Sequence, residues 1–376
     1  MNRLKIFISF FAILFAFAGC NSGNQKKTGD KDPIKIGAIL ALSGESGMWG
    51  KNTRNGAEIA INEINATGGI LGRKVEIVYE DSKGIPNDAI AGVNKLISTS
   101  KVQCIIGDVT SSDILAVAPI CEKNKIILLN FGVSADITKA GDYIFRNWNS
   151  SVSDAKFTSA FATKNYKKIV VLYQNDAYGL SSKESFVNGL NGKGVEIVYT
   201  GTFEREQTDF RTLLNTFKSK NYDAIYIASY YKEALNVLKQ CKTLNVRFKA
   251  ILGTSEWEEG ALTEFVKTNF PDKVFYGYPL PPDSTIPIRK HFVDAYIVKY
   301  QKQPEILCDN GYDAILMLKY GIEKSNSYDA TKIKDALYTL KNFQGASGRM
   351  SFDSNGDVDK PFGLRNITNQ GLIWVR

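Results

Sequence analysis

The sequence predicts an α/β protein made of two doubly wound, Rossmann-like lobes joined by a hinge. Short apolar runs alternate with segments of helical periodicity along most of the chain, and the same order of elements occurs twice. A chain of 376 residues is long enough for two such units, at about 100–200 residues each. Ligands bind beyond the carboxyl ends of strands in open α/β sheets, so two facing units predict a site in the cleft between them.

The first unit opens with a buried strand at 34–40, where apolar residues dominate. Apolar residues then recur on one helix face from Ala57 to Ile64, and Gly68-Gly69 ends that helix. Further elements alternate after it, with strands at 75–79, 102–106 and 126–129 and helices at 86–100 and 112–122. This order predicts a parallel sheet with helices on both of its faces.

A second unit follows the first. The five residues at 75–79 recur letter for letter at 195–199. Around them, 168–173 resembles the opening strand and 224–226 corresponds to 104–106. We therefore expect a repeat of the first unit. Two later helices and a hairpin with an Asn-Gly turn complete the prediction, at 288–300, 313–323 and 350–357.

Residues 1–19 have the pattern of an export signal. A basic start precedes an apolar stretch from 6 to 18, which is shorter than the roughly 20 residues of a spanning helix. The stretch ends at Cys20 in a segment that resembles the lipobox of bacterial lipoproteins, with Phe17 where leucine is usual. We expect a signal peptide at 1–19, a lipidated Cys20 that anchors the protein to a membrane, and a tether at 20–32. Secretion with Cys20 as an ordinary thiol is the alternative.

Composition and motifs exclude several classes of protein. The chain has one histidine, His291, so a histidine-rich metal site is excluded. A catalytic triad would have to use the same His291, which lies in a helical pattern typical of a surface residue. The net charge is +8, but the basic residues form no cluster beyond the tether, which argues against nucleic acid as a partner. The acidic residues at 353–357 lack calcium-loop spacing, and no phosphate-binding loop occurs. We expect no metal, no cofactor and no enzymatic activity.

The other four cysteines are widely spaced and form no C-x-x-C pair; they are Cys104, Cys121, Cys241 and Cys308. Their apolar or helical surroundings favour buried thiols. A disulfide bond between Cys104 and Cys121 is the alternative.

Hydroxyl groups follow two strands of the first unit. Those at 110–112 come after a buried strand, where they can cap the next helix or, together with its free N–H groups, bind a carboxylate. Capping alone is the alternative. Ser111 is the central hydroxyl of this group. Gly132 and Ser134 follow the next strand and are suited to the same anion.

Aromatic and acidic residues follow other strands. The glycine-rich segment 41–50 is expected to be a loop that places Trp49 before the first helix. Tyr178 and Tyr230 lie after strands of the second unit, where their rings can cover a ligand or simply pack between the lobes. Glu256 follows a further strand and can accept hydrogen bonds from an ammonium group, although a charge at a helix N-terminus explains it equally well.

Segments along the whole chain resemble the periplasmic binding proteins of branched-chain amino acid ABC transporters. The resemblance lies in 34–37, 42–44, 64–74, 106–107 with Ser111-Ser112, 145–146, 311–314 and 345–353. It implies a type I periplasmic binding fold. It also implies three crossovers between the lobes, near Asn147, Pro279 and Gly356. The lobes would then comprise 33–147 plus 280–356, and 148–279 plus 357–376.

The resemblance also implies roles for the site residues. Ser111, Gly132 and Ser134 correspond to the positions that bind the carboxylate of the ligand, and the aromatic contacts fall on Trp49, Tyr178 and Tyr230. The acidic residue that holds the amino group falls on Ser255 in an alignment without a gap, or on Glu256 if the loop is shifted by one. Serine at that position would remove the main partner of an α-ammonium group.

We therefore expect a monomeric, lipid-anchored solute-binding protein in the periplasm or at the cell surface. It would capture a small amino acid, branched-chain or similarly apolar, and deliver it to the permease subunits of an ABC transporter. A ligand-sensing receptor for a signalling partner is one alternative. Binding of a carboxylate or amide other than an amino acid is another.

Overall fold

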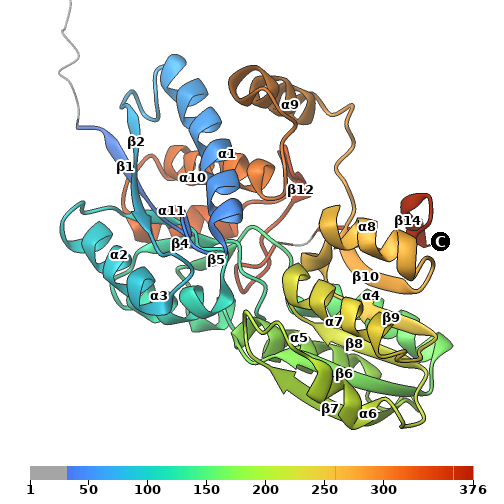
Figure 1. Ribbon diagram of the computed structural model, residues 1–376. Coiled ribbons are helices and arrows are strands. Elements are labelled where there is room, and N and C mark those ends of the chain that lie inside the picture. The colour runs from blue at the N-terminus through green and yellow to red at the C-terminus, as the bar shows by residue number, and fades with distance from the viewer. Residues whose placement is uncertain (1–31, 259, 359, 376) are drawn as a thin grey trace, which may run out of the picture.

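The computed structural model describes residues 32–258, 260–358 and 360–375, which form two large β-sheets with helices on both faces and one two-stranded hairpin (Figure 1). The predicted signal peptide, Cys20 and nearly all of the predicted tether lie outside the described residues. No helix within the described part of the chain is both long enough and apolar enough to cross a membrane.

The first sheet contains five parallel strands in the order β2-β1-β3-β4-β5. Their bounds are β1 (Ile34–Leu40), β2 (Val75–Asp81), β3 (Cys104–Ile106), β4 (Ile127–Asn130) and β5 (Ile144–Arg146). Six of the seven residues of β1 are buried, because helices cover both faces of this sheet. The predicted parallel sheet is confirmed.

The second sheet has the order β14-β13-β10-β9-β8-β6-β7, and its first five strands in chain order are parallel. Its strands are β6 (Lys168–Gln174), β7 (Glu196–Phe203), β8 (Ala224–Ala228), β9 (Ala250–Gly253), β10 (Val274–Pro279), β13 (Phe362–Thr368) and β14 (Gly371–Val375). The order β7-β6-β8-β9-β10 repeats that of the first sheet. The recurring five-residue segment supplies five of the seven residues of β2 in one sheet and four of the eight residues of β7 in the other, so the repeat is structural.

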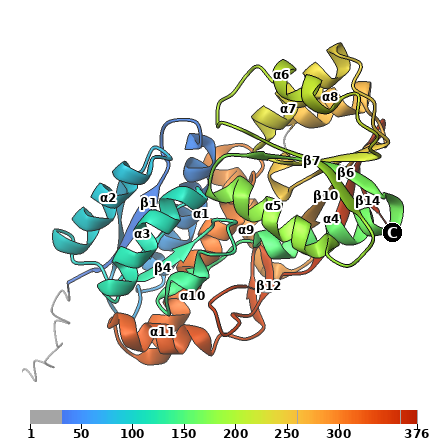
Figure 2. The ribbon, with the colours of Figure 1, turned by 90° about the horizontal axis from the view of Figure 1, so that it is seen from below.

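Helices cover both faces of each sheet, as in a doubly wound fold. On the first sheet, one face packs against α1 (Gly47–Ala66), α10 (Cys308–Ser325) and α11 (Ala330–Tyr338), and the other against α2 (Pro86–Ser98) and α3 (Ser111–Lys123). Helix α9 (Pro287–Tyr300) packs on the outer side of α1 and α10. On the second sheet, α6 (Arg211–Phe217), α7 (Tyr231–Thr243) and α8 (Gly260–Asn269) lie opposite α4 (Ser151–Asn165) and α5 (Ala177–Leu190). Figure 2 shows the late helices α10 and α11 beside the first part of the chain.

Helix α1 begins ten residues before Ala57, so the prediction that Trp49 precedes the first helix is wrong. The glycines in this segment permit close packing. A Cβ atom on Gly50 would lie 2.0 Å from the carbonyl oxygen of Ala41, and one on Gly56 would lie 1.7 Å from that of Cys308. Glycine therefore lets α1 approach both β1 and α10, and Trp49 is held on a helix.

The chain passes between the sheets three times, after β5, after β10 and after β12 (Gly348–Met350). Amide groups fix the first passage: Asn147 Nδ2 donates to the Asn310 carbonyl over 3.0 Å, and Asn310 Nδ2 donates to the Asn147 carbonyl over 2.8 Å. A short hairpin that the sequence did not predict pairs β12 with β11 (Phe343–Gly345). The predicted Asn-Gly turn lies just after it, closed by one bridge between Phe352 and Val358.

The four described cysteines are buried free thiols, as the surroundings predicted. Cys104 packs on the α10 side of the first sheet, whereas Cys121 packs on the α3 side. Because the sheet separates them, the disulfide bond named above as the alternative does not form.

Candidate ligand-binding site

The site predicted from the sequence lies where the carboxyl ends of the two sheets meet. The loops after β3 and β4 come from the first sheet, and the starts of α5 and α7 come from the second. One apolar cluster contains Val109, Phe131 and Val133 of these loops together with Tyr178 and Tyr230 of the second lobe. The lobes therefore touch through the segments that the sequence singled out.

Ser111 is the first residue of α3 and is almost completely buried. Its Oγ accepts a hydrogen bond from the backbone N–H of Ser134 over 3.1 Å. Thr110 occupies the N-cap, but its side chain accepts no hydrogen bond from the helix. The structure therefore brings Ser111 and Ser134 together, and the α3 N-terminus lacks the side-chain cap proposed as the alternative. Free N–H groups at a helix start favour an anion.

A buried arginine that the sequence did not single out as a site residue holds the second loop. Arg146 donates through one terminal nitrogen, Nη1, to the carbonyl oxygens of Gly132 and Ser134, each over 2.9 Å, and its Nε lies 2.6 Å from Asp357 Oδ1. Gly132 packs closely, because a Cβ there would lie 2.4 Å from the end of the Ile114 side chain. Arg146 thus holds the loop of Gly132 and Ser134 through its carbonyl groups, and Asp357 forms an ion pair with the arginine.

Three aromatic side chains form a stack that crosses between the lobes. Trp49 on α1 lies 5.3 Å from Tyr230 between ring centroids, and Tyr230 stacks on Tyr178 at 4.6 Å. The Tyr178 hydroxyl is 2.6 Å from Thr254 Oγ1, which satisfies its polar end inside the protein. Aromatic pairs at these distances stabilise by about 0.5–1.5 kcal/mol beyond burial. All three predicted aromatic residues therefore lie together, beside the loop of Ser134.

Ser255 and Glu256 occupy different environments. Ser255 is fully buried, its N–H donates to Asp154 Oδ2 over 2.7 Å, and its Oγ accepts from Asn149 over 3.0 Å. Glu256 accepts from Trp148 Nε1 over 3.3 Å, and burial raises its pKa to about 7. The charge of Glu256 also raises the pKa of Tyr178, after burial itself. The pKa of Tyr230 is raised by burial, then by the charge of Asp176, and to a smaller extent by Glu256. Glu256 is therefore close enough to act on both tyrosines of the aromatic stack, together with Asp176.

Comparison with known proteins assigns the family. A family model described as "Periplasmic binding protein" matches residues 33–371. The chain belongs to the periplasmic binding protein family. The resemblance and the fold predicted from the sequence are both confirmed, and the family is one of solute-binding proteins.

Relatives of this binding protein cover nearly the whole chain. A Leu/Ile/Val-binding protein from Rhizobium johnstonii is 29% identical over 337 residues, which cover 86% of this chain and 89% of the relative. A solved leucine-binding protein from Thermotoga maritima has a TM-score of 0.82 at 28% identity, covering 91% of this chain and 98% of its own. A branched-chain amino acid transporter substrate-binding protein from Streptococcus pneumoniae, solved with isoleucine, has a TM-score of 0.77 at 28% identity, covering 91% and 99%.

The binding protein also contains a buried acidic pair that the sequence did not reveal. Asp108 and Asp113 flank Ser111, and both are inaccessible to solvent. Asp108 accepts hydrogen bonds from Ser82 and from the Ala41 N–H, whereas neither carboxyl oxygen of Asp113 receives a hydrogen bond from the described residues. Burial, followed by the charge of Asp108, raises the pKa of Asp113 to about 8. Burial and the neighbouring Asp108 therefore favour the protonated form of Asp113.

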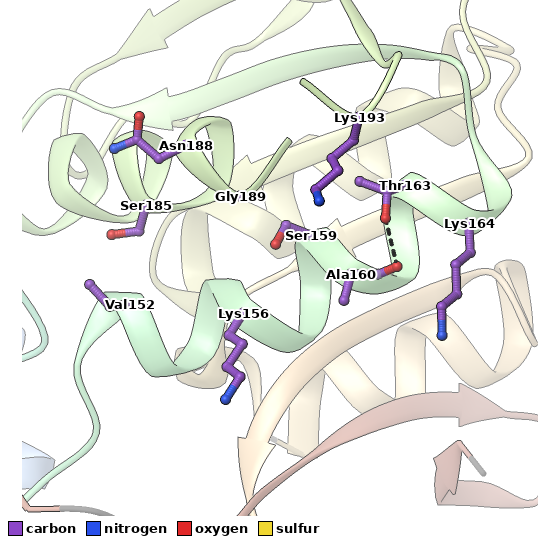
Figure 3. A pocket seen from close by; sticks show the side chains of 10 residues that line it. All are labelled: Val152, Lys156, Ser159, Ala160, Thr163, Lys164, Ser185, Asn188, Gly189 and Lys193. Carbon is purple, nitrogen blue, oxygen red and sulfur yellow. Dashed lines mark hydrogen bonds between the residues drawn. The ribbon is translucent and has the colours of Figure 1, made fainter. Parts of the chain in front are cut away.

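Two hollows in the surface lie away from the predicted site residues. One of about 310 Å³ lies near the crossovers and is lined in part by Trp148, Arg289, Asp309 and Lys360. Burial lowers the pKa of Lys360 there to about 8. The other, of about 640 Å³, runs along the surface between α4 and α5, with Lys156, Lys164 and Lys193 around it and Gly189 at the helix contact (Figure 3). Neither is lined by a residue predicted to bind ligand.

The described residues contain no group of three or more metal-ligating side chains. His291 lies on α9, on the surface, with Nε2 2.8 Å from Glu63 Oε1. It is far in the fold from Ser111, which starts a helix on the opposite face of the first sheet.

Proposed function

We propose that this protein captures a small amino acid with a branched-chain or similar apolar side chain between its lobes and delivers it to an ABC permease. The observation that carries the proposal is the pairing of Ser111 with Ser134 at an uncapped helix start, next to an aromatic stack from both lobes. Relatives named for leucine, isoleucine and valine binding support this ligand class.

In the proposed mechanism, the ligand carboxylate accepts hydrogen bonds from Ser111 Oγ and from the N–H groups at the start of α3. Trp49, Tyr178 and Tyr230 enclose the side chain when the lobes close. Glu256 accepts from the ammonium group, whose positive charge favours the ionised carboxylate. No bond is made or broken, so the protein acts as a binding protein and not as an enzyme, without cofactor or metal.

The place of the protein in the cell is part of the same proposal. Acyl chains on Cys20 would hold a monomer at a membrane, in the periplasm or at the cell surface, with the tether giving it reach to the permease. The lobes are proposed to comprise 33–147 plus 280–356, and 148–279 plus 357–376.

Isothermal titration of the mature chain carrying Cys20→Ser against a panel of amino acids tests the proposal. We expect saturable binding of leucine, isoleucine or valine with one site per chain. If a small carboxylate or amide binds and no amino acid does, the ligand class is that of the carboxylate or amide. Absence of binding to the whole panel would contradict the transport function.

A further inference from the structure

A single carboxylate of the first lobe lies between two cations of the second lobe. Glu45 Oε2 is 3.2 Å from Arg205 Nε, and Glu45 Oε1 is 3.2 Å from Lys232 Nζ. Arg205 also donates from Nη2 to Ser46 Oγ over 2.8 Å. These three contacts join residues that are about 160 to 190 positions apart in the sequence. They connect the two lobes by polar side chains.

The position of these contacts in the fold is at the edge of the lobes opposite the crossovers. Arg205 follows β7, the outermost strand of the second sheet, and Glu45 lies between β1 and α1. The crossovers leave from β5 and β10, on the other side of β4 and β9. When two lobes rotate about a hinge, the gap widens most at the edge farthest from it. Opening of the lobes would therefore break the contacts of Arg205 early.

The surroundings make these ion pairs stronger than ordinary surface pairs. The side chains of Arg205 and Glu45 are only 25% and 22% exposed. The Arg205 guanidinium lies 5.4 Å from the ring centroid of Tyr230, and a cavity of only about 10 Å³ remains between these groups and Trp49. Burial alone would raise the pKa of Glu45, but Lys232 and Arg205 outweigh it and lower that pKa. Partial burial makes the Arg205–Glu45 pair less sensitive to salt than an exposed pair, whereas the Lys232 side chain is 47% exposed and its pair with Glu45 is open to screening.

Arg205 also lies within electrostatic range of other acidic groups at this edge. Burial raises the pKa values of Asp113, Asp176 and Glu233, and the charge of Arg205 offsets part of that rise. The positive charge therefore acts on groups of both lobes.

We propose that Glu45, Arg205 and Lys232 form a latch that assembles only when the lobes close and that sets how long the ligand is retained. The proposal rests on the proposed function, because the latch closes the end of the cleft that holds the aromatic stack. Arg205 is a positioning residue: it holds Tyr230 and the Glu45 loop in the closed arrangement.

Stopped-flow measurement of leucine binding to Glu45→Gln and Arg205→Gln tests the latch. Because the contacts exist only in the closed arrangement, whereas the ligand enters the open one, the dissociation rate should increase by about tenfold, while the association rate changes by less than about twofold. Arg205→Lys should restore part of the retention. High salt should speed dissociation from the wild type and have little effect on Glu45→Gln.

A matched control is available within the second lobe. Arg211 Nη2 lies 2.5 Å from Asp209 Oδ2, in an exposed pair that does not cross between the lobes. Arg211→Gln should leave both rates unchanged. Equal dissociation rates in the wild type and Glu45→Gln, or an equal increase in Arg211→Gln, would overturn the latch.

A second measurement separates failure of the latch from failure of the proposed function. Fluorescent labels on Lys51→Cys and Lys239→Cys, both exposed and on opposite lobes, report the distance across the opening. In the ligand-free protein, Glu45→Gln should shift this distance to longer values. If leucine does not bind but this shift occurs, the latch is supported and the ligand assignment fails. If leucine binds but neither the distance nor the dissociation rate changes, the latch is wrong.

Discussion

At the scale of single residues, Ser111 was predictable because its hydroxyl directly follows a buried strand. The residues that position it were not assigned a role from the sequence, since nothing in the letters shows that Arg146, Asp108 and Asp113 are buried. The role of a buried charged residue depends on the residues that contact it, and these are often distant in sequence. Asp357, the partner of Arg146, lies 211 positions away and is an example.

The Ser111 hydroxyl gives the most direct residue-scale prediction. Ser111→Ala should weaken binding of the amino acid by about 1–3 kcal/mol, because it removes a donor to the ligand charge. Titration calorimetry measures the change. Ser112→Ala is the matched control, since Ser112 is the neighbouring hydroxyl and is only partly buried. Affinity that is unchanged in Ser111→Ala would mean that the hydroxyl serves the loop of Ser134 and not the ligand.

Asp113 predicts how stability depends on pH. Burial raises its pKa in the folded protein to about 8, whereas the pKa in the unfolded chain is near the ordinary value of about 4. Between these values the folded state keeps a proton that the unfolded state releases. Stability contributed by this group is therefore complete below about pH 4 and is lost as the pH rises to about 8. Asp154, with its pKa raised by burial to about 7, acts in the same direction.

Asp113→Asn should remove part of the loss of stability that accompanies rising pH. An amide cannot ionise, so the variant should be more stable than the wild type at pH 8 by about 1–3 kcal/mol, with the difference shrinking toward pH 5. Urea unfolding at several pH values measures it. Asp209→Asn serves as the control, because Asp209 is exposed and its pKa is lowered by Arg211 to about 2, below this range. A parallel stability profile for wild type and Asp113→Asn would refute the assignment.

At the scale of elements, the strands that the sequence predicted lie within a few residues of their expected places, whereas β5, β10, β13 and β14 were not predicted and two helices start earlier than expected. Strands of this fold are short apolar runs, which the sequence displays directly. Helices α1 and α10 both begin before their apolar periodicity, in segments that contain glycine. A Cβ on Gly311 of α10 would lie 2.1 Å from the Thr53 carbonyl oxygen of α1. Glycine there serves close helix packing, which sequence patterns do not distinguish from a loop.

Gly50→Ala tests this explanation of the early start of α1. The added methyl group would overlap the Ala41 carbonyl oxygen, so we expect a loss of about 1–3 kcal/mol of stability in urea unfolding. Gly260→Ala is the control, because a Cβ there meets no atom within 4 Å. That variant should be neutral or slightly stabilised. Equal stability of Gly50→Ala and wild type would show that the segment adapts.

At the scale of the whole molecule, the repeat of five residues led to the correct architecture, because two similar units must use similar strand orders. The joining of the lobes was not predictable from the residues alone. The approach of Arg205 to Glu45 depends on how two separately folded sheets face each other. The same holds for the aromatic stack, where Trp49 and the two tyrosines come from different lobes.

A crystal structure of the protein with bound leucine would test the proposed site most directly. We expect the ligand carboxylate within hydrogen-bond distance of Ser111 Oγ and the ligand side chain against Trp49 and Tyr230. Leucine bound only in the hollow beside Lys360, or only in the groove between α4 and α5, would contradict the proposed site.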